Sequence, residues 1–212
     1  MAVDVTLDHA CAADSPVIRT LLARAYRENP LMTWALPDAD TRDDACAAWL
    51  GPSVDRYLAV GRVHVARAHG QVVGVAAWRQ PGASAPPPTL PTPAGVLAAL
   101  VGRRRAEEIL GALGSAAALA PDEPSAYLNY LAVEPGLQGQ GVGRRLVEHG
   151  IAAAEGVGTY LGTTDARNLP FYRRLGYWQA GSVPLGADGP VLRVLHRGQA
   201  SASSANHMTV SP

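Results

Sequence analysis

The stretch from Tyr127 to Gly143 constrains this chain more than any other feature. Residues 127–133 form an apolar, aromatic-rich run of strand length, and Pro135 stops it. Residues 138–143 form a glycine-dense turn, and residues 144–155 have the composition of a helix. A strand, a glycine turn and a helix in this order leave backbone N–H groups pointing at an anion, and glycine lets a phosphate approach the backbone closely. The sequence therefore predicts a phosphate-binding turn, with a turn that binds no ligand as the alternative.

The glycine spacing excludes two common phosphate motifs. A dinucleotide fingerprint needs glycines at i, i+2 and i+5. The last of these positions holds Arg144 when counting starts at Gly139, and Leu146 when counting starts at Gly141. A nucleotide P-loop needs a lysine after its last glycine, and the chain contains no lysine. What remains is Gln138-x-x-Gly141-x-Gly143, preceded by Leu131-Ala132-Val133-Glu134-Pro135.

Composition excludes several other classes of protein. The chain has 212 residues, a length typical of one domain, and 48% of them are hydrophobic. A formal net charge of zero argues against bulk electrostatic binding of nucleic acid. No apolar stretch is long enough to span a membrane, and the N-terminus does not resemble a signal peptide. We therefore expect a soluble cytoplasmic protein without nucleic-acid or membrane partners.

Cysteine and histidine spacing favours neither a disulfide framework nor a metal site. Cys11 and Cys46 form no C-x-x-C pattern, and we expect both to be reduced and buried. The six histidines show no H-x-x-x-H pair and no cluster with cysteine, so no metal is predicted. The absence of lysine also excludes Schiff-base chemistry.

The predicted elements alternate in a way that indicates an α/β fold. We expect strands at 3–7, 62–67, 71–79, 127–133, 159–164, 178–184 and 191–196, and helices at 15–28, 41–60, 144–155 and 168–175. Residues 81–120 read as a proline-rich loop followed by a helical insertion before the central strand. This order predicts a mostly antiparallel sheet of six to seven strands with helices on both faces and one parallel pair at its centre. Residues 1–197 would form a single domain, and residues 198–212 a disordered tail.

A second motif, residues 163–177, helps to indicate which ligand the glycine turn binds. Asn168 precedes the pair Phe171-Tyr172, and Gly176-Tyr177 closes the helix. Together with the glycine turn, this pattern resembles the GCN5-related N-acetyltransferase (GNAT) superfamily. The form Arg167-Asn168-Leu169-Pro170-Phe171-Tyr172 looks most like puromycin N-acetyltransferase and its bacterial relatives, and Glu28-Asn29-Pro30 with Trp34 is a further match. The resemblance covers most of residues 5–197 and is most specific in the second half.

The resemblance implies a GNAT fold that binds acetyl-CoA. In that family the central strand splays from its neighbour, and the gap receives the pantetheine arm of CoA. Leu131, Ala132 and Val133 would contact this arm and the thioester. The pyrophosphate would be held by Gln138, Gly139, Gln140, Gly141, Val142, Gly143 and Arg144. Asn168 would bond the CoA arm, although a helix N-cap alone would explain it. Tyr172 would donate a proton to the departing CoA thiolate, with packing on the CoA arm as the alternative.

The predicted reaction is direct attack of a primary amine on acetyl-CoA in a ternary complex. The group that deprotonates the amine is left open. The candidates are Glu28, Asp165, and His64 or Tyr130 acting through water; alternatively, the proton leaves through ordered water without a single base. Candidates for the acceptor pocket are Tyr26, Glu28, Asn29, Met32, Trp34 and Trp178, all of which could instead be core residues.

The sequence thus predicts an N-acetyltransferase for a small-molecule amine, such as an amine-bearing antibiotic or metabolite. The alternatives are a protein or peptide N-acetyltransferase and a non-catalytic acyl-CoA-binding regulatory module. The protein could be a monomer or a homodimer. Residues 103–105, three consecutive arginines, favour a solvated helix turn over an RNA-binding patch.

Overall fold

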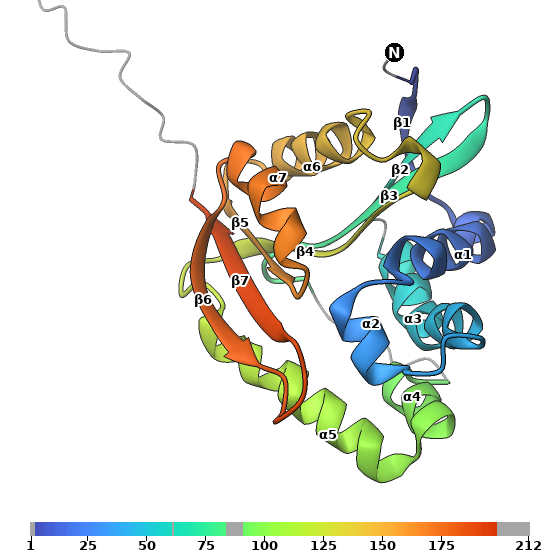
Figure 1. Cartoon of the computed structure of the whole chain (residues 1–212). Helices are drawn as coiled ribbons and strands as arrows, with labels where there is room; N and C mark the ends of the chain where they lie inside the picture. The colour runs from blue at the N-terminus through green and yellow to red at the C-terminus, as the bar shows by residue number, and fades with distance from the viewer. Residues whose placement is uncertain (1–2, 61, 84–90, 199–212) are drawn as a thin grey trace, which may run out of the picture.

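A seven-stranded sheet with helices on both faces forms the core of the protein (Figure 1). The computed structural model describes residues 3–60, 62–83 and 91–198. The predicted tail 198–212 lies almost entirely outside these residues, as does part of the predicted proline-rich loop. The strands are β1 (Thr6–His9), β2 (Val63–Ala68), β3 (Gln71–Arg79), β4 (Ser125–Val133), β5 (Gly158–Thr163), β6 (Trp178–Pro184) and β7 (Val191–Arg197).

The strand order confirms the predicted sheet. It runs β1-β2-β3-β4-β5-β7-β6, and every neighbouring pair is antiparallel except β4 with β5. The first strand begins at Thr6 instead of Val3, because its ladder with β2 covers only Thr6 to His9. The last two strands form the predicted hairpin, and β7 lies between β5 and β6.

The helices also follow the predicted order. They are α1 (Ser15–Tyr26), α2 (Pro30–Ala35), α3 (Arg42–Ala59), α4 (Pro93–Val101), α5 (Arg103–Gly114), α6 (Val142–Ala153) and α7 (Leu169–Arg174). In the described ranges, short 3-10 turns lie between a strand and a helix: η1 (Ala12–Asp14), η2 (Ser115–Leu119), η3 (Pro135–Leu137) and η4 (Ala166–Asn168). None of the helices in the described ranges is both long and apolar enough to cross a membrane.

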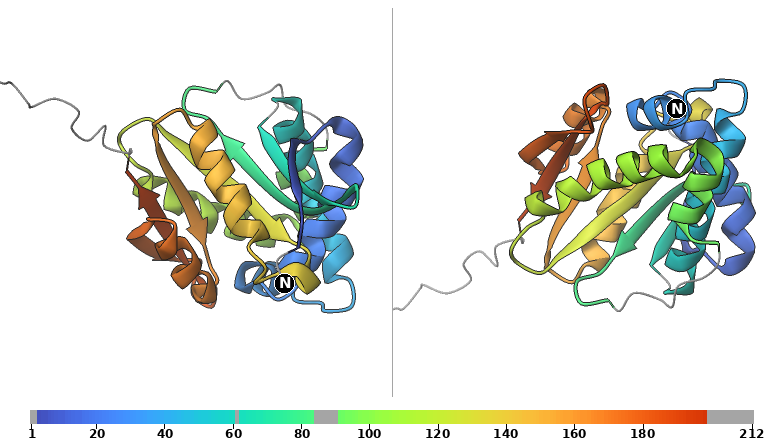
Figure 2. Two further views of the ribbon diagram at one scale, coloured as in Figure 1. Left: turned by 90° about the horizontal axis from the view of Figure 1, so that it is seen from above. Right: turned by 90° about the horizontal axis from the view of Figure 1, so that it is seen from below.

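Two hydrophobic clusters hold the helices on opposite faces of the sheet (Figure 2). Side chains alternate between the faces along a strand. On β3, Val75 and Ala77 therefore pack with α1 to α5, whereas Ala76 and Trp78 pack with α6 and α7. On the face that Ala76 and Trp78 share, α6 lies over the centre of the sheet and α7 lies beside it.

Trp78 and Gly150 set how closely α6 approaches the sheet. Gly150 lies in the middle of α6, and a Cβ there would fall 2.2 Å from Nε1 of Trp78. The indole is fully buried against the helix backbone, so only glycine fits at this position. This contact seats α6, and therefore its N-terminus, relative to the central strand.

The central parallel pair separates after four residues. Ser125 to Leu128 of β4 pair with Gly158 to Leu161 of β5. Beyond that point β4 continues to Val133 paired with β3, and β5 continues to Thr163 paired with β7. The sheet is thus open between the ends of its two central strands, as the resemblance implied.

Cys46 is buried as predicted, but the same prediction for Cys11 was wrong, because Cys11 is exposed. In the arginine triplet, Arg103 and Arg104 are exposed at the start of α5, as predicted, and Arg105 is partly buried. The Arg105 guanidinium lies 4.4 Å from the centre of the Trp34 ring, donates to the Trp34 carbonyl at 3.1 Å and pairs with Glu108 at 2.9 Å. The cause is tertiary, because α5 packs beside α2, and the sequence alone does not show this neighbour.

His64 is a buried histidine on the α6 face of the sheet. It is buried between His9 and His149, with ring centroids 4.8 and 4.6 Å away, and its Nδ1 has no hydrogen-bond partner among the described residues. Burial, followed by the neighbouring His149 and His9, lowers the pKa of His64 from 6.5 to about 4. The folded state therefore binds fewer protons than the unfolded state between these two values.

We expect the free energy of unfolding to fall as the pH drops from 6.5 to 4, by up to about 3 kcal/mol. Urea unfolding at a series of pH values measures this change. His64→Val should flatten the pH dependence in this window, whereas His69→Asn, in the exposed β2–β3 turn, should leave it unchanged. Equal slopes in wild type and His64→Val would show that another group is responsible.

Candidate functional site

A cavity of about 570 Å³ opens where β4 and β5 separate. This volume is in the range typical of small-molecule sites. Its walls come from the α1–α2 connection, α3, η2, both central strands and α7. The polar and aromatic lining residues are Tyr26, Asn29, Trp49, Ser53, Arg79, Tyr127, Asn129, Tyr130, Tyr160, Thr163, Thr164, Asn168 and Tyr172. The site therefore combines segments that lie far apart in the sequence.

The Tyr26 side chain forms hydrogen bonds with the backbone of Leu131 inside the gap. Its phenol oxygen accepts a hydrogen bond from the Leu131 N–H at 3.1 Å and donates one to the Leu131 carbonyl at 3.2 Å. These two groups face away from β3, and the strand separation leaves them without a β5 partner. A buried backbone group without a hydrogen bond is costly, so Tyr26 stabilises the open part of the sheet. Leu131 is one of the backbone positions for which the resemblance implied contact with the CoA arm.

Val133 presents the next backbone group along the same edge. The Gln138 side chain donates from Nε2 to its carbonyl at 3.2 Å. Ala132, between Leu131 and Val133, is buried in the cluster with α1 to α5. Two of the three predicted strand positions therefore offer backbone groups to the gap, and the third packs in the core.

The glycine turn has the conformation that only glycine readily adopts. Gly139 has a φ of 77° and Gly141 a φ of 88°, and no atom lies within 4 Å of where their Cβ atoms would be. Their backbone is thus open to a ligand. Gly143 has no positive φ, and its Cβ would make only ordinary contacts with Val133 and Phe171.

The turn ends at the N-terminus of α6, where Gly141 is the N-cap. The N–H groups of the first helical turn point out of the helix and carry its positive end. The Gln140 side chain donates to the Gly136 carbonyl at 3.3 Å and braces the turn. Arg144 pairs with Glu148 at 2.8 Å, so its backbone N–H, more than its guanidinium, faces the turn. Val142 is buried and anchors the helix start.

Asn168 and Tyr172 lie on the α7 side of the cavity. The Asn168 side chain makes no capping hydrogen bond, so the N-cap explanation is wrong. Asp165 performs that role for η4 by accepting from the Arg167 N–H at 2.9 Å. Asn168 is exposed, and its amide is available to a ligand in the gap.

Tyr172 is buried with its ring against Phe171 and Tyr177, at centroid distances of 5.0 and 5.9 Å. Burial, followed by the neighbouring tyrosines Tyr177 and Tyr127, raises the pKa of its phenol well above the usual value. The phenol is therefore protonated at neutral pH. Its hydroxyl forms no hydrogen bond with any residue of the described ranges. The side chain can thus hold a proton for a group in the cavity.

Asn29 lines the cavity, but its side chain is already engaged. Its Oδ1 accepts from the Leu31 N–H at 2.9 Å, which caps α2, and from the Thr164 hydroxyl at 3.0 Å. The second bond ties α2 to the end of β5 across the gap. Asn29 therefore shapes the cavity wall.

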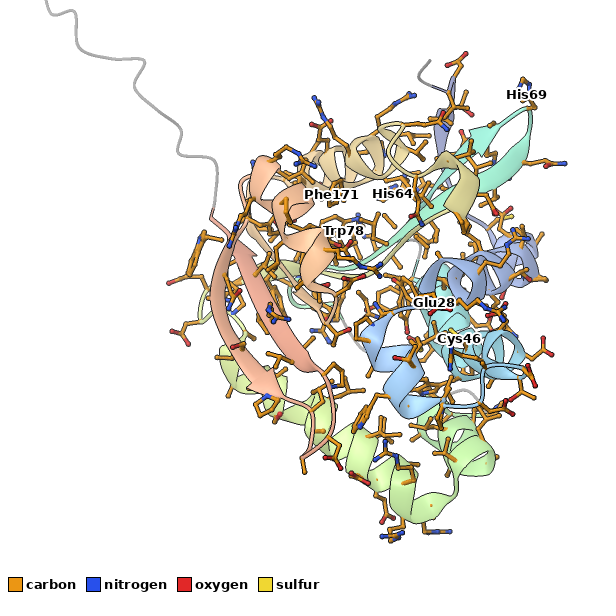
Figure 3. The ribbon with its side chains drawn as sticks, viewed as in Figure 1. Glu28, Cys46, His64, His69, Trp78 and Phe171 are labelled. Atoms are coloured by element: carbon orange, nitrogen blue, oxygen red, sulfur yellow. The ribbon has the colours of Figure 1, made fainter. Side chains whose placement is uncertain are left out.

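Several predicted residues lie outside the cavity. Glu28 has a side chain that is 75% exposed, at the α1–α2 connection (Figure 3). Trp34 is covered by Arg105, and Trp178 lies exposed on β6. His64 lies on the other face of the sheet, under α6 (Figure 3).

The remaining candidates for a base are also unsuited to the role. Asp165 is paired with Arg167 at 2.7 Å, and that contact, ahead of the other causes, lowers its pKa. Burial raises the pKa of Tyr130. The cavity lining in the described ranges contains neither a carboxylate nor an imidazole. No group of three or more metal-binding side chains occurs among the described residues.

The far wall of the cavity was not predicted from the sequence. Tyr127 and Tyr160 face each other from β4 and β5, with ring centroids 4.7 Å apart, and Arg79 reaches over them from β3. Five of the seven tyrosines in the chain line this single cavity. Strand alternation within residues 127–133 could have indicated that Tyr127 faces a ligand, but the register that pairs it with Tyr160 is a tertiary fact.

Comparison with known proteins finds similarity to acetyltransferases. Residues 94–179, from α4 into β6, match the acetyltransferase (GNAT) domain family. The peptidyl-lysine N-acetyltransferase YjaB of Salmonella typhimurium is 29% identical over 73 residues, which cover 33% of this chain and 50% of YjaB. The chain thus spans about half the length of this curated relative.

Solved structures match over nearly the whole chain. A crystal structure of a histone acetyltransferase HPA2 and related acetyltransferase from Corynebacterium glutamicum aligns with a TM-score of 0.72 and 28% identity, over 96% of this chain and 100% of that one. Arylalkylamine N-acetyltransferase 2 from Aedes aegypti aligns with a TM-score of 0.63 and 10% identity, over 92% and 99%. The second likeness concerns the fold alone. These findings support the GNAT superfamily.

Tyr26→Phe tests the role of the phenol in the gap. We expect it to lower the free energy of unfolding by about 1–3 kcal/mol, because the Leu131 N–H and carbonyl lose their partner. Chemical denaturation followed by circular dichroism measures the change. Tyr172→Phe is the matched control, since its hydroxyl makes no hydrogen bond in the described ranges, and it should leave stability nearly unchanged. Similar losses in both variants would contradict this role for Tyr26.

Proposed function

We propose that the protein is an acetyl-CoA-dependent N-acetyltransferase of the GNAT superfamily that acetylates a primary amine of a small molecule. One observation carries the proposal: the edge of β4 that has no β5 partner begins in the cavity, where Leu131 and Tyr172 both line the wall, and ends at Val133, whose carbonyl accepts a hydrogen bond from Gln138 of the glycine turn. A ligand that lies along this edge would connect an anion at the glycine turn with a reacting group in the cavity.

Acetyl-CoA would supply the activated acetyl group. The open backbone at Gly139 and Gly141 and the N–H groups of the first turn of α6 fit a pyrophosphate without any lysine. The backbone edge from Leu131 to Val133 fits the amides of a pantetheine arm, and Asn168 lies beside it. Tyr26 and Gln138 would exchange their hydrogen bonds with this edge for bonds elsewhere when the arm enters.

Tyr172 would act as the general acid. Its phenol is protonated at neutral pH and faces the cavity, so it can give a proton to the sulfur that leaves when the amine takes the acetyl group. A covalent acetyl-enzyme is disfavoured, because neither Cys11 nor Cys46 lines the cavity, and burial raises the pKa of the Cys46 thiol to about 12. The acceptor ammonium would lose its proton to water, since the described lining offers no carboxylate or imidazole.

Small-molecule acceptors are supported by the walls of the cavity. Aromatic and aliphatic side chains dominate them, and the ends of α5 and η2 add small and aliphatic residues to the lining. The motif Arg167-Asn168-Leu169-Pro170-Phe171-Tyr172 adds its resemblance to puromycin N-acetyltransferase, which favours an amine-bearing antibiotic or metabolite. We propose a cytoplasmic enzyme, a monomer or homodimer.

A protein acceptor is the second candidate, because YjaB is a peptidyl-lysine N-acetyltransferase. A thiol-release assay with acetyl-CoA over aminonucleosides, aminoglycosides, polyamines and short peptides separates the candidates. Turnover of small amines supports the first proposal, and turnover of peptides alone supports the second. Binding of acetyl-CoA without turnover of any amine would indicate a regulatory module.

Tyr172→Phe should lower kcat by about 10²–10⁴-fold with little change in the affinity for acetyl-CoA, because it removes only the proton donor. Steady-state kinetics with calorimetry of acetyl-CoA binding measures both quantities. Tyr57→Phe, whose ring is not part of the cavity lining, should leave kcat unchanged. An unaltered kcat in Tyr172→Phe would leave this residue with a packing role only.

A further inference from the structure

Arg79 is the one charged side chain among the described residues that line the cavity. It ends β3, is exposed to solvent and lies at the wall formed by Tyr127 and Tyr160. The other lining residues are aromatic, aliphatic, amide or hydroxyl side chains. A single positive charge in an otherwise neutral cavity selects ligands by charge.

The Arg79 guanidinium is held in place but not neutralised. It donates to the Tyr160 hydroxyl at 3.0 Å, and its central carbon lies 5.1 Å from the centre of the Tyr127 ring. Every aspartate and glutamate of the chain lies in the described ranges, and none of them forms an ion pair with Arg79. The remaining N–H donors of the guanidinium are therefore available to an anion, and the two tyrosines pre-organise them.

Arg79 lies too far from the glycine turn to serve the same phosphates. It pairs with Tyr127, which is six residues before Val133 on β4. At a strand rise of about 3.3 Å per residue, the backbone of Arg79 is roughly 20 Å from the start of the turn and roughly 13 Å from Leu131. A ligand that reaches both Leu131 and Arg79 must be elongated.

We propose that Arg79 binds an anionic group of the acceptor, so that the acceptor is an elongated amine with an apolar or aromatic middle and a carboxylate or phosphate at its far end. This inference rests on the proposed function, because it takes the gap near Leu131 as the place of the amine. Tyr127, Tyr130 and Tyr160 would pack on the middle of the acceptor. A diamine would place its second positive charge next to the Arg79 guanidinium, and the described lining offers no carboxylate to pair with that charge.

The test uses pairs of acceptors that differ only in charge. The probes are ω-aminoalkyl benzoic acids of increasing chain length, their primary amides, and the matching aminoalkyl phenyl phosphates. We expect kcat/KM for an acid or a phosphate to exceed that for its amide by about 10- to 100-fold. Arg79→Met should remove this preference while leaving kcat/KM for the amides unchanged. Arg104→Met, which removes an exposed arginine on α5, should keep it.

Two outcomes separate this inference from the proposed function. Equal kcat/KM for acids and amides, or a preference that survives in Arg79→Met, overturns the anion site while acetyl transfer stands. If no probe is acetylated, calorimetry of the acids and amides with the CoA-bound protein decides the question. Tighter binding of the acids that is lost in Arg79→Met supports the site, and equal binding overturns it. Thermal unfolding of Arg79→Met shows that the variant is folded.

Discussion

The separation of β4 from β5 is the constraint on which the rest of the site depends. Two central strands pair for four residues and then diverge, and this removes hydrogen-bond partners from the edge of a buried strand. A regular sheet would have closed this edge with a ladder. Here the exposed backbone groups need other partners, and the surrounding side chains supply them or leave room for a ligand.

Tyr26 and Gln138 show how the protein stabilises the open edge. Tyr26 comes from α1 and satisfies both backbone groups of Leu131, and Gln138 comes from the glycine turn and satisfies the Val133 carbonyl. Each partner is a side chain and can rotate away, whereas a neighbouring strand could not. The same geometry therefore keeps the sheet stable and allows a ligand to replace these side chains as the hydrogen-bond partners of the β4 edge. This suits a site that receives an extended ligand.

The charge inside the cavity is determined by the side chains that surround the gap. Acidic side chains pair with arginines on the surface, as Arg24 with Glu134 and Arg27 with Asp43 do, and none of them lines the cavity. Several tyrosines line the cavity, and burial raises the pKa of Tyr172 above its usual value. Such a site favours proton donation over proton abstraction, and its only fixed charge in the described lining is that of Arg79.

The order of elements, the parallel central pair and the glycine turn at the start of α6 could be predicted from the sequence, because they depend on local periodicity and on the φ values that glycine alone adopts readily. The motif that contains Asn168 and Tyr172 was also visible in the sequence. Tertiary packing was needed to show that Tyr26 bonds Leu131, that Arg105 covers Trp34, and that His64 lies under α6. It alone joined Arg79, Tyr127 and Tyr160, because strand register and helix packing, not neighbouring residues, bring such side chains together.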